Sequence, residues 1–136
     1  MPPMSNHTVV NLKEVENQAE KFGFAPDLEA RFAAGDLGLE KTGLSYQALA
    51  PNLRMPFGHR HREQEEIYVV LTGTGRMNVD GEVLEIRALD AVRVAPDAAR
   101  SFEAGPEGLA FVAFGAPRTA RESAAADTEQ LPGWWG

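Results

Sequence analysis

Turn signals that recur at short intervals constrain the fold of this chain more than any other feature of its sequence. From Gly43 onward, apolar and polar residues alternate with a period of two, which is typical of half-buried strands. Asp80-Gly81 is the clearest hairpin signal, because both residues tolerate the positive φ of a two-residue turn. Further breaks fall at Pro51-Asn52, Gly73-Thr74-Gly75, Ala95-Pro96-Asp97 and Gly105-Pro106-Glu107-Gly108. This spacing predicts an all-β protein, built as a sandwich or a small barrel.

Residues 1–42 are expected to form a helical and extended segment that packs on this β structure. Apolar residues at helical spacing predict a short amphipathic helix over residues 12–22. Asn11 offers a capping-box-like start to this helix, and Gly23 offers a stop. The apolar stretch 28–33 is too short to assign to a helix or a strand.

Residues 43–115 are predicted to be the barrel, and residues 116–136 an extended C-terminal tail. The composition of residues 116–130 turns to Ala, Arg, Glu and Ser, which predicts an exposed stretch, helical in part at most. Both tryptophans of the chain, Trp134 and Trp135, lie at its end. Since each indole buries a large area when it docks, we expect a docked terminus that covers the barrel, caps a sheet edge or crosses to a second subunit.

Composition sets limits on the partners of the chain. With 136 residues and no cysteine, it is long enough for one core without disulfides, and thiol chemistry is excluded. The net charge of −7 disfavours binding to nucleic acid or to anionic membranes. No run approaches the ~20 apolar residues of a membrane span, and the N-terminus lacks a basic patch and an apolar run. We therefore expect a cytoplasmic protein that binds neither nucleic acid nor membranes.

Two histidines immediately before the most apolar strand candidate suggest a metal site. His59 and His61 are separated by one residue, so on an extended chain both side chains point to the same face and could share one ion. An alternative is a solvated edge, since Arg60 and Arg62 flank the pair. Imidazole combined with a carboxylate suits Zn, Fe, Mn, Ni or Cu better than Ca or Mg.

The carboxylate of such a site would come from Glu65 or Glu66. The odd spacing between His61 and Glu66 would place their side chains on opposite faces of an uninterrupted strand. A turn or bulge must therefore intervene, and the polar run of residues 62–65 is suited to form it.

These residues resemble the first motif of the cupin superfamily, in which a glycine, His-x-His, a glutamate and a further glycine follow one another. Here His59-x-His61 is followed after four residues by Glu66 and after six more by Gly73. The position of Gly73 selects Glu66 over Glu65. Asn52 stands for the opening glycine, and Asn also tolerates positive φ. The resemblance implies a double-stranded β-helix, the jelly-roll barrel of cupins.

The second cupin motif is degenerate in residues 89–102. Leu89 replaces its glycine, and Arg100 or Ser101 falls where its histidine ligand normally stands. A guanidinium has no lone pair to donate and repels a divalent cation. Three roles for Arg100 remain open: an ion pair with Glu66 that blocks the site, a bidentate clamp for a carboxylate or phosphate, or an exposed place on the rim.

The resemblance places a ligand pocket inside the barrel, and it does not select a reaction. The metal ligands would be His59, His61 and Glu66, and the ligand-binding side chains would be Arg100, Tyr68, Met77 and Phe102.

Three hypotheses about function follow. The first is a metal-dependent enzyme, of the oxygenase or isomerase type, that acts on a small anionic metabolite with a bound Zn, Fe, Mn or Ni ion. The second is a metal-free binding module in which Arg100 and the histidines recognise an anion. The third is a structural or interaction protein with a filled cavity. In each case we expect a homodimer, because small jelly-roll domains with exposed sheet edges often associate.

Overall fold

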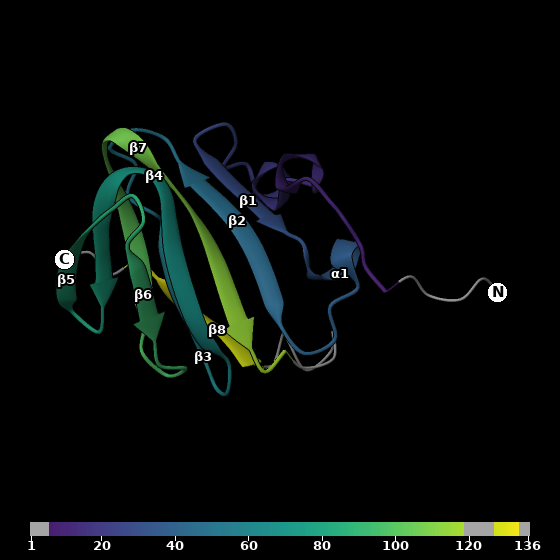
Figure 1. Cartoon of the computed structure of the whole chain (residues 1–136). Coiled ribbons are helices and arrows are strands. Elements are labelled where there is room, and N and C mark those ends of the chain that lie inside the picture. Colours follow the sequence, from purple (N-terminus) through teal and green to yellow (C-terminus); the bar gives the residue numbers. More distant parts are fainter. Residues whose placement is uncertain (1–5, 119–126, 134–136) are drawn as a thin grey trace.

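The computed structural model describes residues 6–118 and 127–133 and consists mainly of antiparallel strands (Figure 1). The strands are β1 (Leu28–Phe32), β2 (Gly43–Leu49), β3 (Phe57–His61), β4 (Glu65–Val79), β5 (Glu82–Arg87), β6 (Ala91–Val94), β7 (Arg100–Ala116) and β8 (Thr128–Pro132). Short helical segments are η1 (Leu12–Glu14), η2 (Gln18–Phe22) and α1 (Ala34–Leu37). The predicted all-β class is confirmed.

The strands form one curled sheet that is organised around β4 and β7. The hydrogen-bonded path runs β1-β2-β7-β3-β8, and β4 pairs with β5, β6 and β7. The ladder between β4 and β7 extends from the Glu65–Ala116 pair to the Val79–Arg100 pair. β2 and β6 pair with one end of this ladder, whereas β3 and β5 pair with the other. The sheet therefore folds over on itself and encloses an interior (Figure 1).

Both long strands bend where the sequence predicted that strands would end. The β4–β7 register shifts between Val70 and Thr72 and again between Gly73 and Gly75. Gly73 has a φ of 81°, and a Cβ atom there would lie 2.0 Å from the carbonyl oxygen of Gly108. Only glycine permits this approach. The glycines that were expected to separate strands instead let two continuous strands curl together.

The predicted hairpin at Asp80-Gly81 is confirmed. β4 and β5 pair up to Val79 and Glu82, and the two residues between them have φ values of 51° and 91°. Positive φ at both central residues is the requirement of a type I′ turn. The side chain of Asn78 accepts a hydrogen bond from the backbone N–H of Gly81 at 2.8 Å, which fixes the turn.

An aromatic cluster fills the barrel beside the predicted site. The rings of Phe102 and Phe111 are stacked with centroids 4.3 Å apart, and the ring of Tyr68 lies 5.0 Å from that of Phe102. Met77 is opposite Phe102 in the β4–β7 register and is fully buried. Aromatic pairs of this kind contribute about 0.5–1.5 kcal/mol beyond the burial of their area. These side chains are buried in the interior of the barrel, and the ligand-binding role of Tyr68, Met77 and Phe102 stays a prediction.

The N-terminal segment is helical, but it is not one continuous helix. Asn11 accepts from the backbone N–H of Lys13, and Gly23 ends η2 with a φ of 77°, so both predicted ends are confirmed. Between η1 and η2, Asn17 forms a β-bridge with Arg31 and its side chain accepts from the N–H of Ala30 at 2.9 Å. This pairing with β1 interrupts the helix, a tertiary contact that helical periodicity cannot report.

The C-terminal region contains a strand, β8, that the sequence did not predict, and the residues of β8 that lie within the stretch expected to be exposed are exposed. β8 pairs antiparallel with β3 over five residue pairs, from Phe57–Pro132 to His61–Thr128. Strand β7 extends one residue past the expected barrel boundary, to Ala116. The predicted docking of Trp134 and Trp135 lies outside the described residues. Residues 28–32, which the sequence left unassigned, form β1.

Candidate metal centre

Two imidazoles, a carboxylate and a phenol meet in the interior of the barrel. His59 and His61 come from β3, and Glu66 and Tyr68 come from β4. Nε2 of His59 lies 3.3 Å from Oε1 of Glu66, and Nε2 of His61 lies 3.1 Å from the same oxygen. The hydroxyl of Tyr68 donates to this oxygen at 2.6 Å. One ligand atom from each of His59, His61 and Glu66 lies within 4.8 Å of the others.

The chain brings the acid to the histidines through a turn, as the odd spacing required. β3 ends at His61 and β4 begins at Glu65, with a bend at residues 62–63. Glu66 is 9% exposed and faces inward, whereas Glu65 is exposed and lies 3.8 Å from Arg93 on the surface. The choice of Glu66 over Glu65, made from the position of Gly73, agrees with this geometry.

Asp127, immediately before β8, contacts the outer side of His61. Oδ2 of Asp127 lies 3.0 Å from Nδ1 of His61, and Oδ1 accepts the backbone N–H of Glu63 at 2.7 Å. The backbone carbonyl of Asp127 accepts the N–H of Arg62 at 2.9 Å. The hydroxyl of Thr128 lies 3.4 Å from the same nitrogen of His61. The turn between β3 and β4 is thus held by Asp127 and the start of β8.

Burial and hydrogen bonding move the pKa values of the site in definite directions. Burial lowers the pKa of His59, and the positive charges of Arg100 and His61 act in the same direction against the attraction of Glu66. Burial alone would raise the pKa of Glu66, but hydrogen bonds from His59, His61 and Tyr68 outweigh it and lower the pKa. Burial and the charge of Glu66 raise the pKa of the Tyr68 hydroxyl well above its ordinary value. At neutral pH, the acid is therefore ionised and the phenol remains a donor.

The surroundings of His61 fit a metal ion. Its Nε2 and Nδ1 each face a carboxylate oxygen, from Glu66 at 3.1 Å and from Asp127 at 3.0 Å. A neutral imidazole carries one N–H, so it can donate to only one of these acids. With a metal ion at Nε2, the remaining N–H on Nδ1 would donate to Asp127, which is the usual arrangement of a metal-bound histidine.

Arg100 lies inside the barrel and is fully buried. Its backbone is opposite His59 in the β3–β7 pairing, and its Nη2 donates to the carbonyl of Ala95 at 3.1 Å. Its Nη1 lies 3.5 Å from the carbonyl oxygen of Pro96, and its Nε has no hydrogen-bond partner among the described residues. No ion pair of Arg100 with a described acid is present within 4.0 Å, so neither the exposed rim nor a direct ion pair with Glu66 describes its position.

At Leu89, the backbone has the left-handed conformation of the glycine that this residue replaces in the second motif. Leu89 adopts a φ of 73°, in the left-handed region that glycine normally occupies, and its side chain is 83% exposed. Its N–H donates to the carbonyl of Val70 at 2.8 Å. Left-handed φ costs a non-glycine residue about 1–2 kcal/mol. The turn is thus preserved with strain and without any buried contact from the leucine side chain.

Comparison with known proteins identifies the family. The family model of the cupin domain matches residues 45–113. The chain belongs to the cupin family. No curated protein matches it.

Several solved structures share the cupin fold. A cupin protein from Bacteroides fragilis is 25% identical, with a TM-score of 0.69 over 86% of this chain and 89% of that chain. An oxalate decarboxylase variant from B. subtilis is 18% identical, with a TM-score of 0.75 over 96% of this chain and 34% of that chain. The Streptomyces nucleoside dehydratase Pac13 is 13% identical, with a TM-score of 0.69 over 96% of this chain and 92% of that chain.

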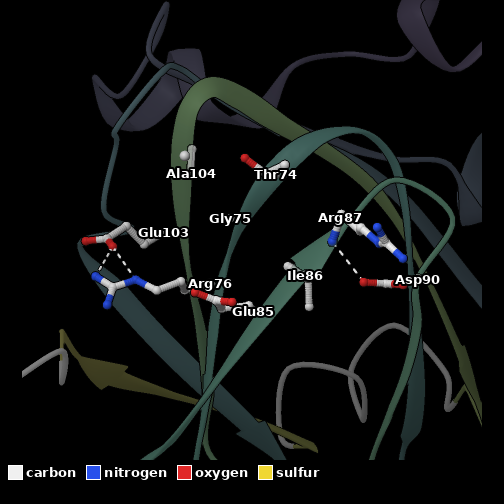
Figure 2. Close-up of a pocket in the computed structure, with 10 residues that line it drawn as sticks. Thr74, Gly75, Arg76, Glu85, Ile86, Arg87, Asp90, Glu103 and Ala104 are labelled. Atoms are coloured by element: carbon white, nitrogen blue, oxygen red, sulfur yellow. Dashed lines mark hydrogen bonds and ion pairs between the residues drawn. The ribbon is translucent and has the colours of Figure 1, made fainter.

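A separate groove of about 630 Å³ is formed mainly by residues of β4, β5 and β7 of this cupin (Figure 2). It is lined by Thr74, Gly75, Arg76, Glu85, Ile86, Arg87, Asp90, Glu103, Ala104 and Gly105. Two of its carboxylates already have partners within the groove. Nε of Arg76 donates to Glu103 at 2.9 Å, and the backbone N–H of Arg87 donates to Asp90 at 2.9 Å. None of the predicted site residues lines this groove. We therefore place the candidate site at the histidine cluster, which contains the possible metal ligands.

Sequence reasoning missed Asp127. This residue lies 66 positions from His61 in the chain, within a stretch that was predicted to be exposed. Its neighbours carry no motif, and residues 128–132, which follow it, have little strand propensity, so no signal in the sequence indicated this contact. In the part of the chain that the structure describes, there is also no helix with the length and apolarity needed to span a membrane.

The pKa shifts predict how the stability of the metal-free protein changes with pH. His59 has a pKa below its ordinary value of 6.5, so the unfolded state binds its proton first as the pH falls. The lowered pKa of Glu66 acts in the same direction below 4.5. The free energy of unfolding should therefore fall on acidification from about pH 6.5. Urea denaturation in the presence of a chelator, at a series of pH values, measures this decrease.

The variant His59→Gln, which cannot titrate at this position, should show a shallower decrease between pH 6.5 and 5. The exposed His7 provides the control, because His7→Gln should leave the slope unchanged. Parallel profiles for the wild type and His59→Gln would contradict the assignment.

Proposed function

We propose that this cupin binds a small anionic metabolite inside its barrel, beside a divalent transition metal ion held by His59, His61 and Glu66. The observation that carries the proposal is the convergence of three donor atoms within 4.8 Å. Zn, Fe, Mn and Ni all accept such a mixed set of imidazole and carboxylate ligands. A cytoplasmic location remains a prediction from the sequence.

The protein groups around the ion would have defined roles. A metal ion with three protein ligands supplies Lewis-acid or redox chemistry at its remaining coordination positions. Tyr68 donates to Glu66, which orients the carboxylate and leaves its second oxygen for other contacts. The aromatic rings of Phe102 and Phe111 exclude water from the wall behind Tyr68. As an enzyme, the protein would be an oxygenase or an isomerase of the cupin type.

The burial of the Arg100 guanidinium supports the proposal that the ligand is an anion. A buried guanidinium is costly unless an acid or several acceptors compensate it. Here the acceptors are two backbone carbonyls, and Nε has none among the described residues. A carboxylate or phosphate in the barrel would complete this hydrogen bonding, since the guanidinium offers a planar, bidentate face. The similarity in fold to an oxalate decarboxylase is consistent with a small acid as the ligand.

An alternative function is a metal-free binding module without catalysis. Burial is the main cause of the lowered pKa of His59, and the nearby charge of Arg100 lowers this pKa further, so Arg100 and His59 are close enough to interact electrostatically. In this alternative, Arg100 and the histidines hold the anion directly, and no metal ion is needed. The two functions differ in whether the purified protein contains a metal ion.

Removal of one ligand tests the metal site. Protein that is purified without chelator or nickel resin should contain near-stoichiometric transition metal by elemental analysis. His61→Ala should lose this metal, because the site would keep only two protein ligands. His7→Ala, which removes an exposed histidine, is the matched control and should retain it. A metal-free wild type would favour the alternative function.

Substitution of Arg100 tests its place in the site. Arg100→His removes a positive charge and puts an imidazole where the second cupin motif has its last ligand. We expect the affinity for Zn²⁺ to rise by about tenfold or more, because even ~1–2 kcal/mol of repulsion corresponds to roughly this factor. Competition with a chromophoric chelator measures the affinity.

The matched control for this experiment is Arg93→His on β6, where the arginine is exposed. It should leave the Zn²⁺ affinity unchanged. Equal affinities of the wild type and Arg100→His would place residue 100 outside the metal centre.

We further propose that the protein is a homodimer that associates through the outer faces of β4 and β7. Ile67, Leu71 and Phe114 are 39%, 41% and 45% exposed, and Ile67 pairs with Phe114 in the ladder. Leu44 on β2 pairs with Phe114 from the other side. Phe114, with its cross-strand neighbours Ile67 and Leu44, forms an exposed apolar group, and Leu71 lies further along β4. Exposed apolar groups on a sheet face support a contact surface between subunits.

Sedimentation velocity tests the dimer. Phe114→Glu should shift the wild-type dimer to monomer, because it puts a charge in the centre of the apolar face. Phe22→Glu, on η2 and 72% exposed, should leave the dimer intact. A monomeric wild-type protein would contradict the proposal.

A further inference from the structure

The strand that carries both histidines depends on the C-terminal strand for its place in the sheet. On one side β3 pairs with β7 at a single position, His59–Arg100. On the other side it pairs with β8 over five positions, ending with His61–Thr128. An ion pair between Arg60 and Glu129, at 2.8 Å, joins the same two strands on the surface. The geometry of the histidines therefore rests on a segment near the end of the chain.

Asp127 extends this support from the backbone to the imidazole. Its two carboxylate oxygens have different partners: Oδ2 faces Nδ1 of His61, and Oδ1 accepts the backbone N–H of Glu63. The side chain of Asp127 is 10% exposed, so water competes little for these contacts. Because a carboxylate has no hydrogen to donate, the contact with Asp127 is satisfied only when His61 carries a proton on Nδ1. With a metal ion in place of a proton at Nε2, the lone pair of Nε2 would then be directed at the ion.

We propose that Asp127 is a positioning residue of the metal centre, which fixes the Nδ1–H form and the ring orientation of His61. This inference rests on the proposed metal function and goes beyond it, because it makes the start of β8 a part of the centre. The cupin motif alone provides the ligands. The contact from Asp127 determines which nitrogen of His61 is available to the ion.

The variant Asp127→Asn tests this role with almost no change in size. Asparagine has a single acceptor oxygen, so either His61 or the N–H of Glu63 must face its NH₂ group. When the NH₂ group faces Nδ1, the proton of His61 moves to Nε2 and the lone pair for the metal is lost. Loss of such a supporting partner typically weakens metal binding by about 10–100-fold. We expect a loss of Zn²⁺ affinity in this range in chelator competition.

A matched control separates positioning from strand stability. Glu129→Gln removes a carboxylate charge two residues further along the chain, within β8, and breaks its ion pair with Arg60. It should change Zn²⁺ affinity by less than about twofold, because exposed ion pairs contribute little. The visible spectrum of bound Co²⁺ should change in Asp127→Asn and stay as in the wild type in Glu129→Gln. Equal Zn²⁺ affinities and Co²⁺ spectra for the wild type and Asp127→Asn would overturn the inference.

A measurement on the wild type keeps the inference testable should Asp127→Asn fail to fold. In ¹⁵N-labelled, Zn²⁺-loaded protein, His61 should show a slowly exchanging proton on Nδ1 and none on Nε2. The opposite assignment would overturn the role of Asp127 while the metal site itself stands. A wild type that binds no Zn²⁺ would overturn both the proposed function and this inference.

Discussion

The pairing of β4 with β7 is the constraint on which the rest of this molecule depends. The two strands stay hydrogen-bonded from the Glu65–Ala116 pair to the Val79–Arg100 pair, although both bend midway. The bend is possible because Gly73 lets the backbone approach Gly108 more closely than any side chain would allow. A flat ladder of this length would leave its apolar face open to water. The bent ladder instead closes around the aromatic cluster and defines an interior.

This closure places unlike charges in one small volume. Glu66 projects from β4 into the interior, and Arg100, at the start of β7, is fully buried as well. The acid collects hydrogen bonds from two imidazoles and a phenol, whereas among the described residues the guanidinium contacts only backbone carbonyls. Within residues 6–118 and 127–133, the acid is thus compensated and the cation is not. This asymmetry is the physical basis for our proposal that an anionic ligand binds between Arg100 and the histidine cluster.

The local features of the fold and the ligands could be predicted from the sequence because they depend on short-range geometry. Period two from Gly43 predicted strands, and Asp80-Gly81 predicted a hairpin, since both patterns act within a few residues. The spacing from His61 to Glu66 required a turn, and the turn is present. Prediction was incomplete at the N-terminal helix, whose two ends were right but whose middle is interrupted, and near the C-terminus, where strand β8 was not foreseen. In both, a distant strand decided the conformation: Asn17 bridges to β1, and β8 adds to the edge of β3.

By itself, the sequence determined the class of the fold, the family through its His-x-His motif, and the chemical character of the site through two imidazoles and one acid. Only the tertiary structure decided that Arg100 is buried with no acidic partner among the described residues, and that Asp127 contacts His61 across 66 positions of the chain. The physical reason is that residue types and their local periodicity are written in neighbouring positions. Burial and partner choice, in contrast, arise when segments far apart in the chain exclude water from a common interior.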